Sequence, residues 1–206
     1  MKKLFVIAIV TLFSLGVVAQ EKIQLPAPQW DKGISKFSLV DALTQRQSVR
    51  EYATTALTDQ ELSNVLWAAC GINRPETKKI TAPSAINAQD IMVFVCREDG
   101  AWRYEPDGQS LVKVSSLDLR KAVAGRQEFA AAAPVCLVLV SDVSRVHDRR
   151  EFGAMDAGYV SENIYLICTA MGLKTVARAS MERDALVREL GLSDSQIPML
   201  NHPIGK

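Results

Sequence analysis

Histidine, cysteine and aromatic residues are scarce in this chain, and it has no excess of charge of either sign. Its 206 residues include two His and four Cys but no Cys-x-x-Cys pair, so a zinc site has almost no support. The 24 Lys and Arg nearly balance the 23 Asp and Glu, which leaves no electrostatic footprint for nucleic acid or an acidic membrane surface. We therefore expect a globular protein with no metal centre and no nucleic-acid partner.

The N-terminus has the three regions of a secretory signal peptide. A basic start, Met1 to Lys3, precedes the apolar run Leu4 to Val18, and Val17 to Ala19 supply the small residues that a signal peptidase reads. The run is shorter than the roughly 20 residues that span a bilayer, and no Cys follows it. We predict a signal peptide over 1–19 and export to the periplasm, with no stable membrane anchor. The alternative is an uncleaved anchor or a hydrophobic helix of the fold.

Each cysteine lies inside an apolar run. The four are Cys70, Cys96, Cys136 and Cys168. Their setting favours small buried thiols, although an exported protein could form disulfides, for which four Cys allow three connectivities.

Capping signals and hydrophobic periodicity predict an α+β fold, with an extended arm over 20–37 and a single domain over 38–206. Helices are expected over 38–47, 58–70, 117–131, 150–171 and 182–190. Strands are expected over 91–97, 101–105, 111–115, 134–141, 174–179 and 197–204, with an antiparallel middle. Residues 72–90 show no periodic pattern and are expected to form a long loop, which in a compact domain is often functional.

Three segments could carry chemistry. In Arg46 to Tyr52, two guanidiniums four residues apart flank the Ser48 hydroxyl, and the fork of an Arg matches phosphate oxygens. In Pro83 to Gln89, amide side chains offer a donor and an acceptor to a heterocycle edge. At His202 to Lys206, the last predicted strand is followed by a Gly and a Lys at the end of the chain. Taken one at a time, they have plainer explanations: a basic helix end, a self-capped polar loop and a frayed tail.

In series, these segments resemble the FMN-dependent nitroreductase family over nearly all of residues 38–206. The matching patterns are Arg-x-Ser-x-Arg-x-Tyr at 46–52 and Pro-Ser-Ala-x-Asn-x-Gln at 83–89. The stretch 156–173, which begins with Asp-Ala-Gly inside the long predicted helix, also matches, as does Pro-Ile-Gly at 203–205.

The resemblance implies a nitroreductase-like fold, with a mostly antiparallel central sheet flanked by helices, in an intertwined homodimer that binds FMN at the subunit interface. The long helix would pack at the dimer core through two rows of small residues. These rows are Gly153 with Ala157, and Ala154 with Gly158.

The resemblance also implies a set of cofactor-binding residues. The side chains of 46–50 would hold the phosphate and ribityl chain, and Ser84 and Asn87 would meet the flavin from the second loop, in the partner subunit. The backbone of 176–179 would lie beside the ring, and Lys206 would reach the phosphate. The complete set is Arg46, Gln47, Ser48, Arg50, Pro83, Ser84, Ala85, Asn87, Val176, Ala177, Arg178 and Lys206.

The implied activity is hydride or electron transfer through flavin N5 to a small aromatic or other electron-poor substrate. The cofactor supplies that chemistry, so we nominate no catalytic side chain. The family usually draws hydride from NADH or NADPH, which are cytoplasmic pools. An exported member would need another electron donor.

Departures from the family pattern leave alternatives open. Asp90 and Ile91 stand where many members have Pro and Trp. The middle strands and short C-terminus are closest to the branch that includes azoline dehydrogenases of peptide-modification clusters, but the Lys-Tyr pair of that branch is missing at 146–152. The alternatives are an azoline-type peptide dehydrogenase, a non-catalytic exported FMN-binding protein, and a structural domain that has lost the flavin.

Overall fold

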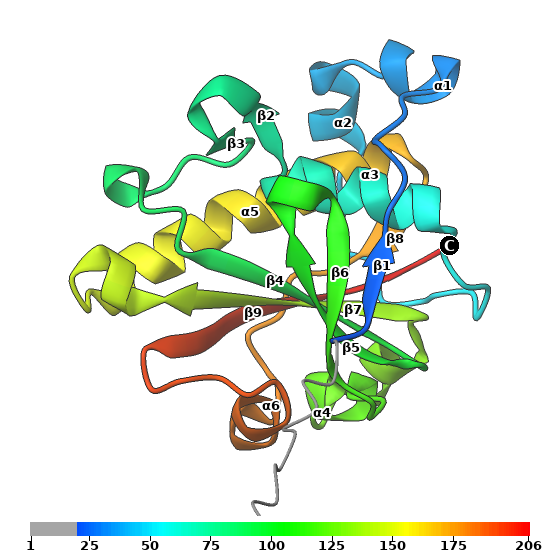
Figure 1. The fold of residues 1–206 in the computed structure, drawn as a ribbon. Helices are drawn as coiled ribbons and strands as arrows, with labels where there is room; N and C mark the ends of the chain where they lie inside the picture. The colour runs from blue at the N-terminus through cyan, green and yellow to red at the C-terminus, as the bar shows by residue number, and fades with distance from the viewer. Residues whose placement is uncertain (1–19) are drawn as a thin grey trace, which may run out of the picture.

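The computed structural model describes residues 20–206 and is built around one large sheet. The predicted signal peptide, 1–19, lies outside the described residues. Seven strands follow the order β1-β6-β5-β4-β7-β9-β8 (Figure 1). They are β1 (Lys22–Gln24), β4 (Ile91–Arg97), β5 (Gly100–Glu105), β6 (Ser110–Ser115), β7 (Val135–Asp142), β8 (Lys174–Thr175) and β9 (Gln196–Gly205). Each neighbouring pair is antiparallel, which confirms the expected α+β class.

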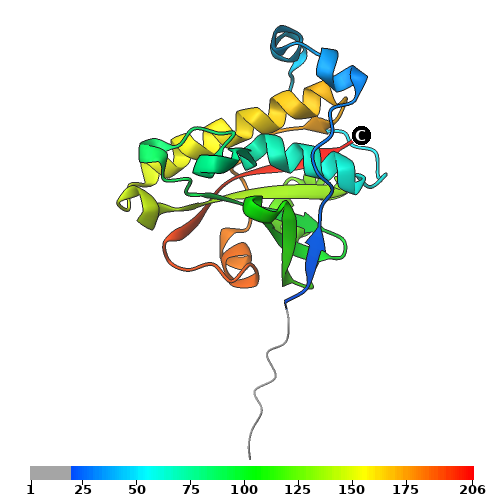
Figure 2. The ribbon, with the colours of Figure 1, turned by 45° about the horizontal axis from the view of Figure 1, so that its top comes forward.

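Strand β7 lies at the centre of the sheet, between β4 and β9. Its side chains are buried from Val135 to Ser141, because both faces of the sheet are covered, as the unbroken apolar run predicted. Leu137 and Leu139 point to the core beneath α3 and α5, whereas Cys136 and Val138 point to the opposite core beneath α4 and α6. Figure 2 shows the two helical layers with the sheet between them. The two-residue period of the strand therefore divides the interior into two cores.

Helices α2 and α3 begin where capping signals placed them, and α5 and α6 fall within the ranges that periodicity predicted. The long elements are α2 (Leu39–Gln45), α3 (Asp59–Cys70), α5 (Arg150–Ala170) and α6 (Arg183–Glu189). Ser38 and Thr58 each form a capping box with the third residue of the helix that follows, so two backbone donors are satisfied at each start. Gly71 ends α3 as expected, and a Cβ there would lie 2.5 Å from the Trp67 side chain.

Four expectations were wrong in part. The arm holds a short helix, α1 (Lys32–Lys36), because the Asp31 carboxylate accepts from the first backbone amides. The expected loop over 72–90 contains a hairpin, β2 (Ile72–Arg74) with β3 (Lys79–Ile80). The helix over 117–131 is broken: α4 (Arg120–Ala124) ends at Gly125, whose φ is +55°, and a 3₁₀ turn follows. Beyond β8, only an isolated bridge from Arg178 continues the strand expected over 174–179.

The small-residue row of Gly153 and Ala157 packs inside its own chain and not against a partner. Both residues are buried on the side of α5 that faces the sheet. A methyl group on Gly153 would overlap the Ser141 hydroxyl on β7 and lie 3.1 Å from Met199 Cε. The glycine is therefore explained by close approach of the α5 backbone to the sheet, which corrects the expected role of this row. The other row, Ala154 and Gly158, is exposed.

The four cysteines are free and buried, as their apolar setting indicated. Burial raises the pKa of the Cys70 and Cys136 thiols to about 12, so both stay protonated and unreactive at neutral pH.

We expect Gly153→Ala to lower the free energy of unfolding by about 1–3 kcal/mol, because the added methyl overlaps Ser141. Helix propensity alone predicts the opposite sign, a gain of about 0.5–1 kcal/mol. Urea unfolding of both proteins measures the difference. A stabilised variant would contradict the close packing of α5 on β7.

Candidate functional site

Residues 46–53 lie along the end of the sheet formed by β8 and β9. The Val49 amide donates to Thr175 O at 2.9 Å, and the Ala53 amide donates to Lys206 O at 2.8 Å. Gly205 leaves room for the ring of Tyr52, since a Cβ there would lie 2.9 Å from the tyrosine Cβ. The first and third predicted segments therefore meet in the folded chain, and Lys206 is held in the sheet instead of fraying.

Tyr165 of α5 joins the segment around Ser48 to the segment around Ala177. Its hydroxyl lies 2.8 Å from Ser48 Oγ and accepts from the Ala177 amide at 2.8 Å. The Arg46 guanidinium lies over the Tyr165 ring, 5.1 Å from its centroid. Tyr165 is not among the predicted site residues, although it falls within the stretch 156–173 that matches the family. The Tyr165 hydroxyl therefore holds the Ser48 segment and the Ala177 segment together in the candidate site.

Beneath Tyr165, His202 is a buried and neutral support. The two rings meet edge to face, with centroids 5.2 Å apart. Thr175 Oγ1 donates its one proton to Pro203 O, so it accepts from His202 Nδ1–H, and Nε2 then accepts from Ser161 Oγ at 2.7 Å. Burial lowers the pKa of His202 to about 3. It therefore holds Tyr165 in place without carrying charge at neutral pH.

Arg46 and Arg50 are cations without an anionic partner in the described part of the chain. Neither guanidinium forms an ion pair there, whereas Arg97, Arg103 and Arg120 each pair with a carboxylate. Arg46 and Arg50 lie two residues before and after Ser48 in the chain, and two guanidiniums with a hydroxyl make a donor set suited to phosphate.

Lys206 is not free in the same way. Its ammonium lies 3.0 Å from Glu61 Oε1, at the first turn of α3. Although burial opposes it, hydrogen bonds from Thr58 together with Lys206 hold the pKa of Glu61 below its usual value. Lys206 would have to leave this carboxylate, or share it, to reach a bound anion.

Arg178 is bound to its own chain. The side chain is buried, and its guanidinium donates to the last carbonyls of α4, Val123 O and Ala124 O, and to Asn201 Oδ1. Its backbone amide and carbonyl pair with those of Asn201. With a further bond from Nε to Gln127 Oε1, the Arg178 side chain uses most of its donors inside the chain and fixes α4 against β9.

The second predicted loop, Pro83 to Gln89, is a strained turn held by α5. Ile86, Asn87 and Gln89 all have positive φ, which costs free energy in residues other than glycine. The Ala85 amide donates to both carboxylate oxygens of Asp156, at 3.0 and 2.9 Å. The strain persists because this contact and others hold the loop, and it leaves Ile86 68% exposed at the tip.

The two predicted halves of the site do not meet within one chain. Asp156, which holds the second loop, and Tyr165, which holds the first, are nine residues apart on α5. They are about 13 Å apart along the axis and on opposite sides of the helix. In Figure 1 the loop that precedes β4 and helix α2 lie at opposite ends of α5. Within one chain, segment 46–50 therefore lies at one end of α5 and loop 83–89 at the other, so neither place has both groups of predicted residues.

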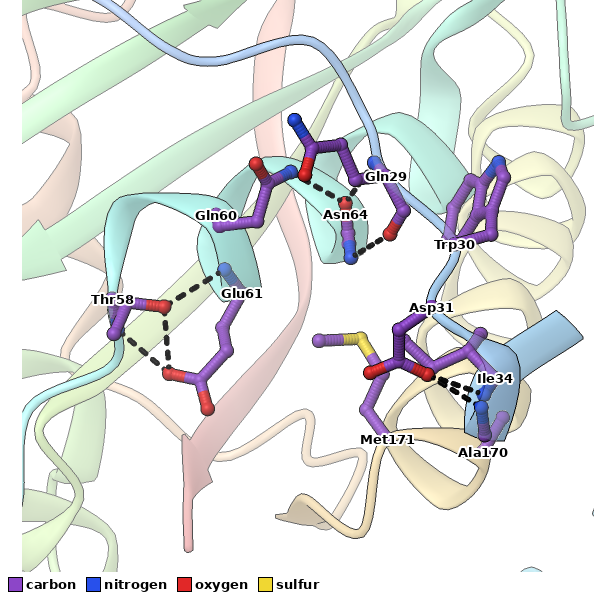
Figure 3. A pocket seen from close by; sticks show the side chains of 11 residues that line it. Gln29, Trp30, Asp31, Ile34, Thr58, Gln60, Glu61, Asn64, Ala170 and Met171 are labelled. Atoms are coloured by element: carbon purple, nitrogen blue, oxygen red, sulfur yellow. Dashed lines mark hydrogen bonds between the residues drawn. The ribbon is translucent and has the colours of Figure 1, made fainter.

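A cavity of about 510 Å³ lies nearby, between the arm, the start of α3 and the end of α5 (Figure 3). Its lining residues are Gln29, Trp30, Asp31, Gly33, Ile34, Thr58, Gln60, Glu61, Asn64, Ala170 and Met171. None of the predicted cofactor residues is among them. Asp31 and Glu61 already accept from helix-terminal amides, so the carboxylates of the cavity serve mainly as caps.

Within residues 20–206, no group of three or more His, Cys, Asp or Glu is arranged to hold a metal ion. In the same range, no helix has the length and hydropathy needed to cross a membrane.

The chain belongs to the nitroreductase family, whose model matches residues 43–206. The family resemblance identified from the sequence is therefore confirmed.

Relatives span almost the whole chain. MJ1384 of Methanocaldococcus jannaschii, assigned as a nitroreductase, is 33% identical over 202 residues, which cover 90% of this chain and 96% of the relative. A solved structure assigned as a nitroreductase of Ralstonia eutropha is 34% identical, with a TM-score of 0.83 over 92% of this chain and 90% of that one. The Escherichia coli microcin synthetase complex shares the fold alone, at 18% identity, with a TM-score of 0.69 over 99% of this chain and 84% of the matched one.

Tyr165→Phe should lower the free energy of unfolding by about 1–2 kcal/mol, because Ser48 and the Ala177 amide lose their shared partner. Tyr159→Phe is the matched control, since that ring is exposed on the same helix. Chemical denaturation compares the two. Equal losses in both variants would show that Tyr165 does not tie the segments together.

Proposed function

We propose that this protein is an FMN-dependent oxidoreductase that reduces a small aromatic or other electron-poor substrate. The observation that carries the proposal is the unpaired Arg46 guanidinium over the Tyr165 ring, whose hydroxyl joins Ser48 to the Ala177 backbone, with the unpaired Arg50 two residues after Ser48 in the chain. Bound flavin would supply hydride or electron transfer through its N5 atom. The chain's own residues bind and orient it.

The residues present fit the phosphate end of FMN. Two arginine forks and a hydroxyl provide charge-assisted donors for a dianion, and no described carboxylate competes for them. Lys206 lies at the same end of the sheet, next to residues 46–53, and can add a third positive charge by turning from Glu61. Val176 and Ala177 form a backbone wall behind this cradle, with the Ala177 amide already occupied by Tyr165.

We propose that a homodimer completes the site. Loop 83–89 lies too far along α5 to face the cradle of its own chain, so Ser84 and Asn87 would reach the flavin of the partner. Large apolar side chains are exposed on the elements that such a dimer would cover. They are Leu39, Val40 and Leu43 on α2, Ile86 in the loop, and Met155 and Tyr159 on α5. Leu39, Val40 and Leu43 lie on the one short helix α2, and an exposed apolar patch marks an interaction site.

The electron donor and the compartment are part of the proposal. NADH or NADPH is the reductant that the family implies. If the leader over 1–19 exports the protein, a donor outside the cytoplasm must replace them, and cell fractionation decides between these cases.

Replacing Arg46 and Arg50 with Ala, singly, should weaken FMN binding about 10- to 100-fold each, because each change removes a charge-assisted contact to phosphate. Arg126→Ala is the control, since it removes the same charge from an exposed position on the opposite layer. Flavin fluorescence quenching measures the dissociation constants. Unchanged binding in both site variants would remove the phosphate assignment.

Leu43→Glu should dissociate the dimer and release FMN, because α2 would carry a charge into the apolar interface. Leu117→Glu is the matched control: Leu117 is 55% exposed and Leu43 57%, but Leu117 lies between β6 and α4. Analytical ultracentrifugation and the visible spectrum give the two readouts. A Leu43→Glu dimer that retains flavin would contradict the interface.

A further inference from the structure

Cys96 and Cys136 face each other across the ladder between β4 and β7. Their Cα atoms are opposed in the register of this antiparallel pair, and both side chains are fully buried. Residues opposed in this way have Cα atoms about 4.5–5.5 Å apart and side chains on the same face of the sheet. A disulfide requires Cα atoms about 4.4–6.8 Å apart. The two strands therefore already hold these cysteines at a separation that an S–S bond accepts.

The sheet divides the four cysteines into two pairs. Cys96 and Cys136 belong to the core beneath α4 and α6, whereas Cys70 and Cys168 belong to the core beneath α3 and α5. Two of the three possible connectivities would join a cysteine of one core to a cysteine of the other, through the sheet. Only the remaining connectivity joins cysteines that share a core, and within it only Cys96 and Cys136 are opposed in a strand ladder.

The core around this pair accepts the loss of the thiol protons. Cys136 Sγ donates a weak hydrogen bond to Ala130 O at 3.5 Å. The same carbonyl accepts from the Ala133 amide at 3.4 Å, so it keeps a partner when the thiol proton is lost. Oxidation of Cys136 therefore does not leave this buried carbonyl unpaired.

We propose that Cys96 and Cys136 form a cross-strand disulfide when the chain folds in an oxidising compartment. Two S–H bonds break and one S–S bond forms, while two electrons and two protons pass to a disulfide oxidant, which is reduced to two thiols. A thiol–disulfide oxidase supplies such an oxidant in the cell, and oxidised glutathione supplies one in solution. The cellular setting rests on the predicted export, whereas the flavin assignment is not involved.

Burial places the formation of this bond during folding. The thiolate is the attacking species in thiol–disulfide exchange, and burial raises the pKa of both thiols, that of Cys136 to about 12. The folded, reduced pair is therefore slow to oxidise, and the folded disulfide is sheltered from reductants in the same way. The state of the pair then records the redox conditions under which the chain folded.

Refolding of the purified protein in a glutathione redox buffer tests the pair directly. The reduced, denatured chain is refolded with reduced and oxidised glutathione, alkylated with iodoacetamide in denaturant, and mapped by peptide mass spectrometry. We expect a cross-link between the peptides that carry residues 96 and 136, which dithiothreitol removes. Alkylated Cys96 and Cys136, or a cross-link from either of them to Cys70 or Cys168, would overturn the proposal.

The stability of the two redox forms gives a second readout. The oxidised protein should have a urea midpoint about 1 M higher than the reduced protein, because the cross-link restricts the unfolded chain. Cys136→Ala should abolish both the cross-link and this difference. Cys168→Ala is the matched control, since it removes an equally buried thiol from the other core and should retain both. The same midpoint difference in Cys136→Ala as in the wild type would contradict the pair.

Cys96→Ala removes the other sulfur of the same bond and replaces Cys136→Ala if that variant folds poorly. The peptide map of the wild-type protein needs neither variant, so the proposal stays open to refutation in either case.

Cell fractionation separates this proposal from the predicted export. Acid quenching followed by alkylation fixes the thiol state of the chain in each fraction. A cross-link between Cys96 and Cys136 in the exported fraction supports both. A cytoplasmic protein with four free thiols that cross-links in glutathione buffer leaves the cysteine pair standing and removes the export. An exported protein in which both cysteines are free would overturn the pair.

Discussion

The close approach of helix α5 to strand β7 is the contact on which the candidate site depends. Gly153 allows it by leaving room for the Ser141 hydroxyl, and Ala157 continues the same buried face. Once α5 is fixed there, Asp156 and Tyr165 are fixed with it. Asp156 holds loop 83–89 through the Ala85 amide, and Tyr165 joins the Ser48 hydroxyl to the Ala177 amide. The helix therefore acts as a rigid rod with a separate attachment point near each end.

The site depends on local charge and not on net charge. The whole chain is nearly neutral, yet Arg46 and Arg50 have no described carboxylate partner, while the buried His202 and Arg178 side chains are hydrogen-bonded to groups of their own chain. A cradle that is saturated with its own salt bridges could not bind a phosphate strongly. The unpaired state of these two cations is what makes them available to a ligand.

Local signals in the sequence predicted most of the fold. The Ser38 cap, the capping box at Thr58 and the apolar run of β7 all act within a few residues, and each gave an element at the expected place. The β2–β3 hairpin was missed because its turn uses Lys78 with positive φ, where a glycine signal would be expected. The contacts of Tyr165 with Ser48 and Ala177, and of Asp156 with Ala85, were missed because they join residues from distant segments. The Arg-x-Ser-x-Arg pattern can be read in the sequence, but its polar support cannot.

The central claim is that this chain recognises the phosphate of FMN through its unpaired arginines. Parallel titrations with FMN and with riboflavin, which differ only in that phosphate, test it most directly. The account predicts that FMN binds at least about 100-fold more tightly, with the difference shrinking as salt is added. Equal affinity for the two flavins, at any salt concentration, would contradict it.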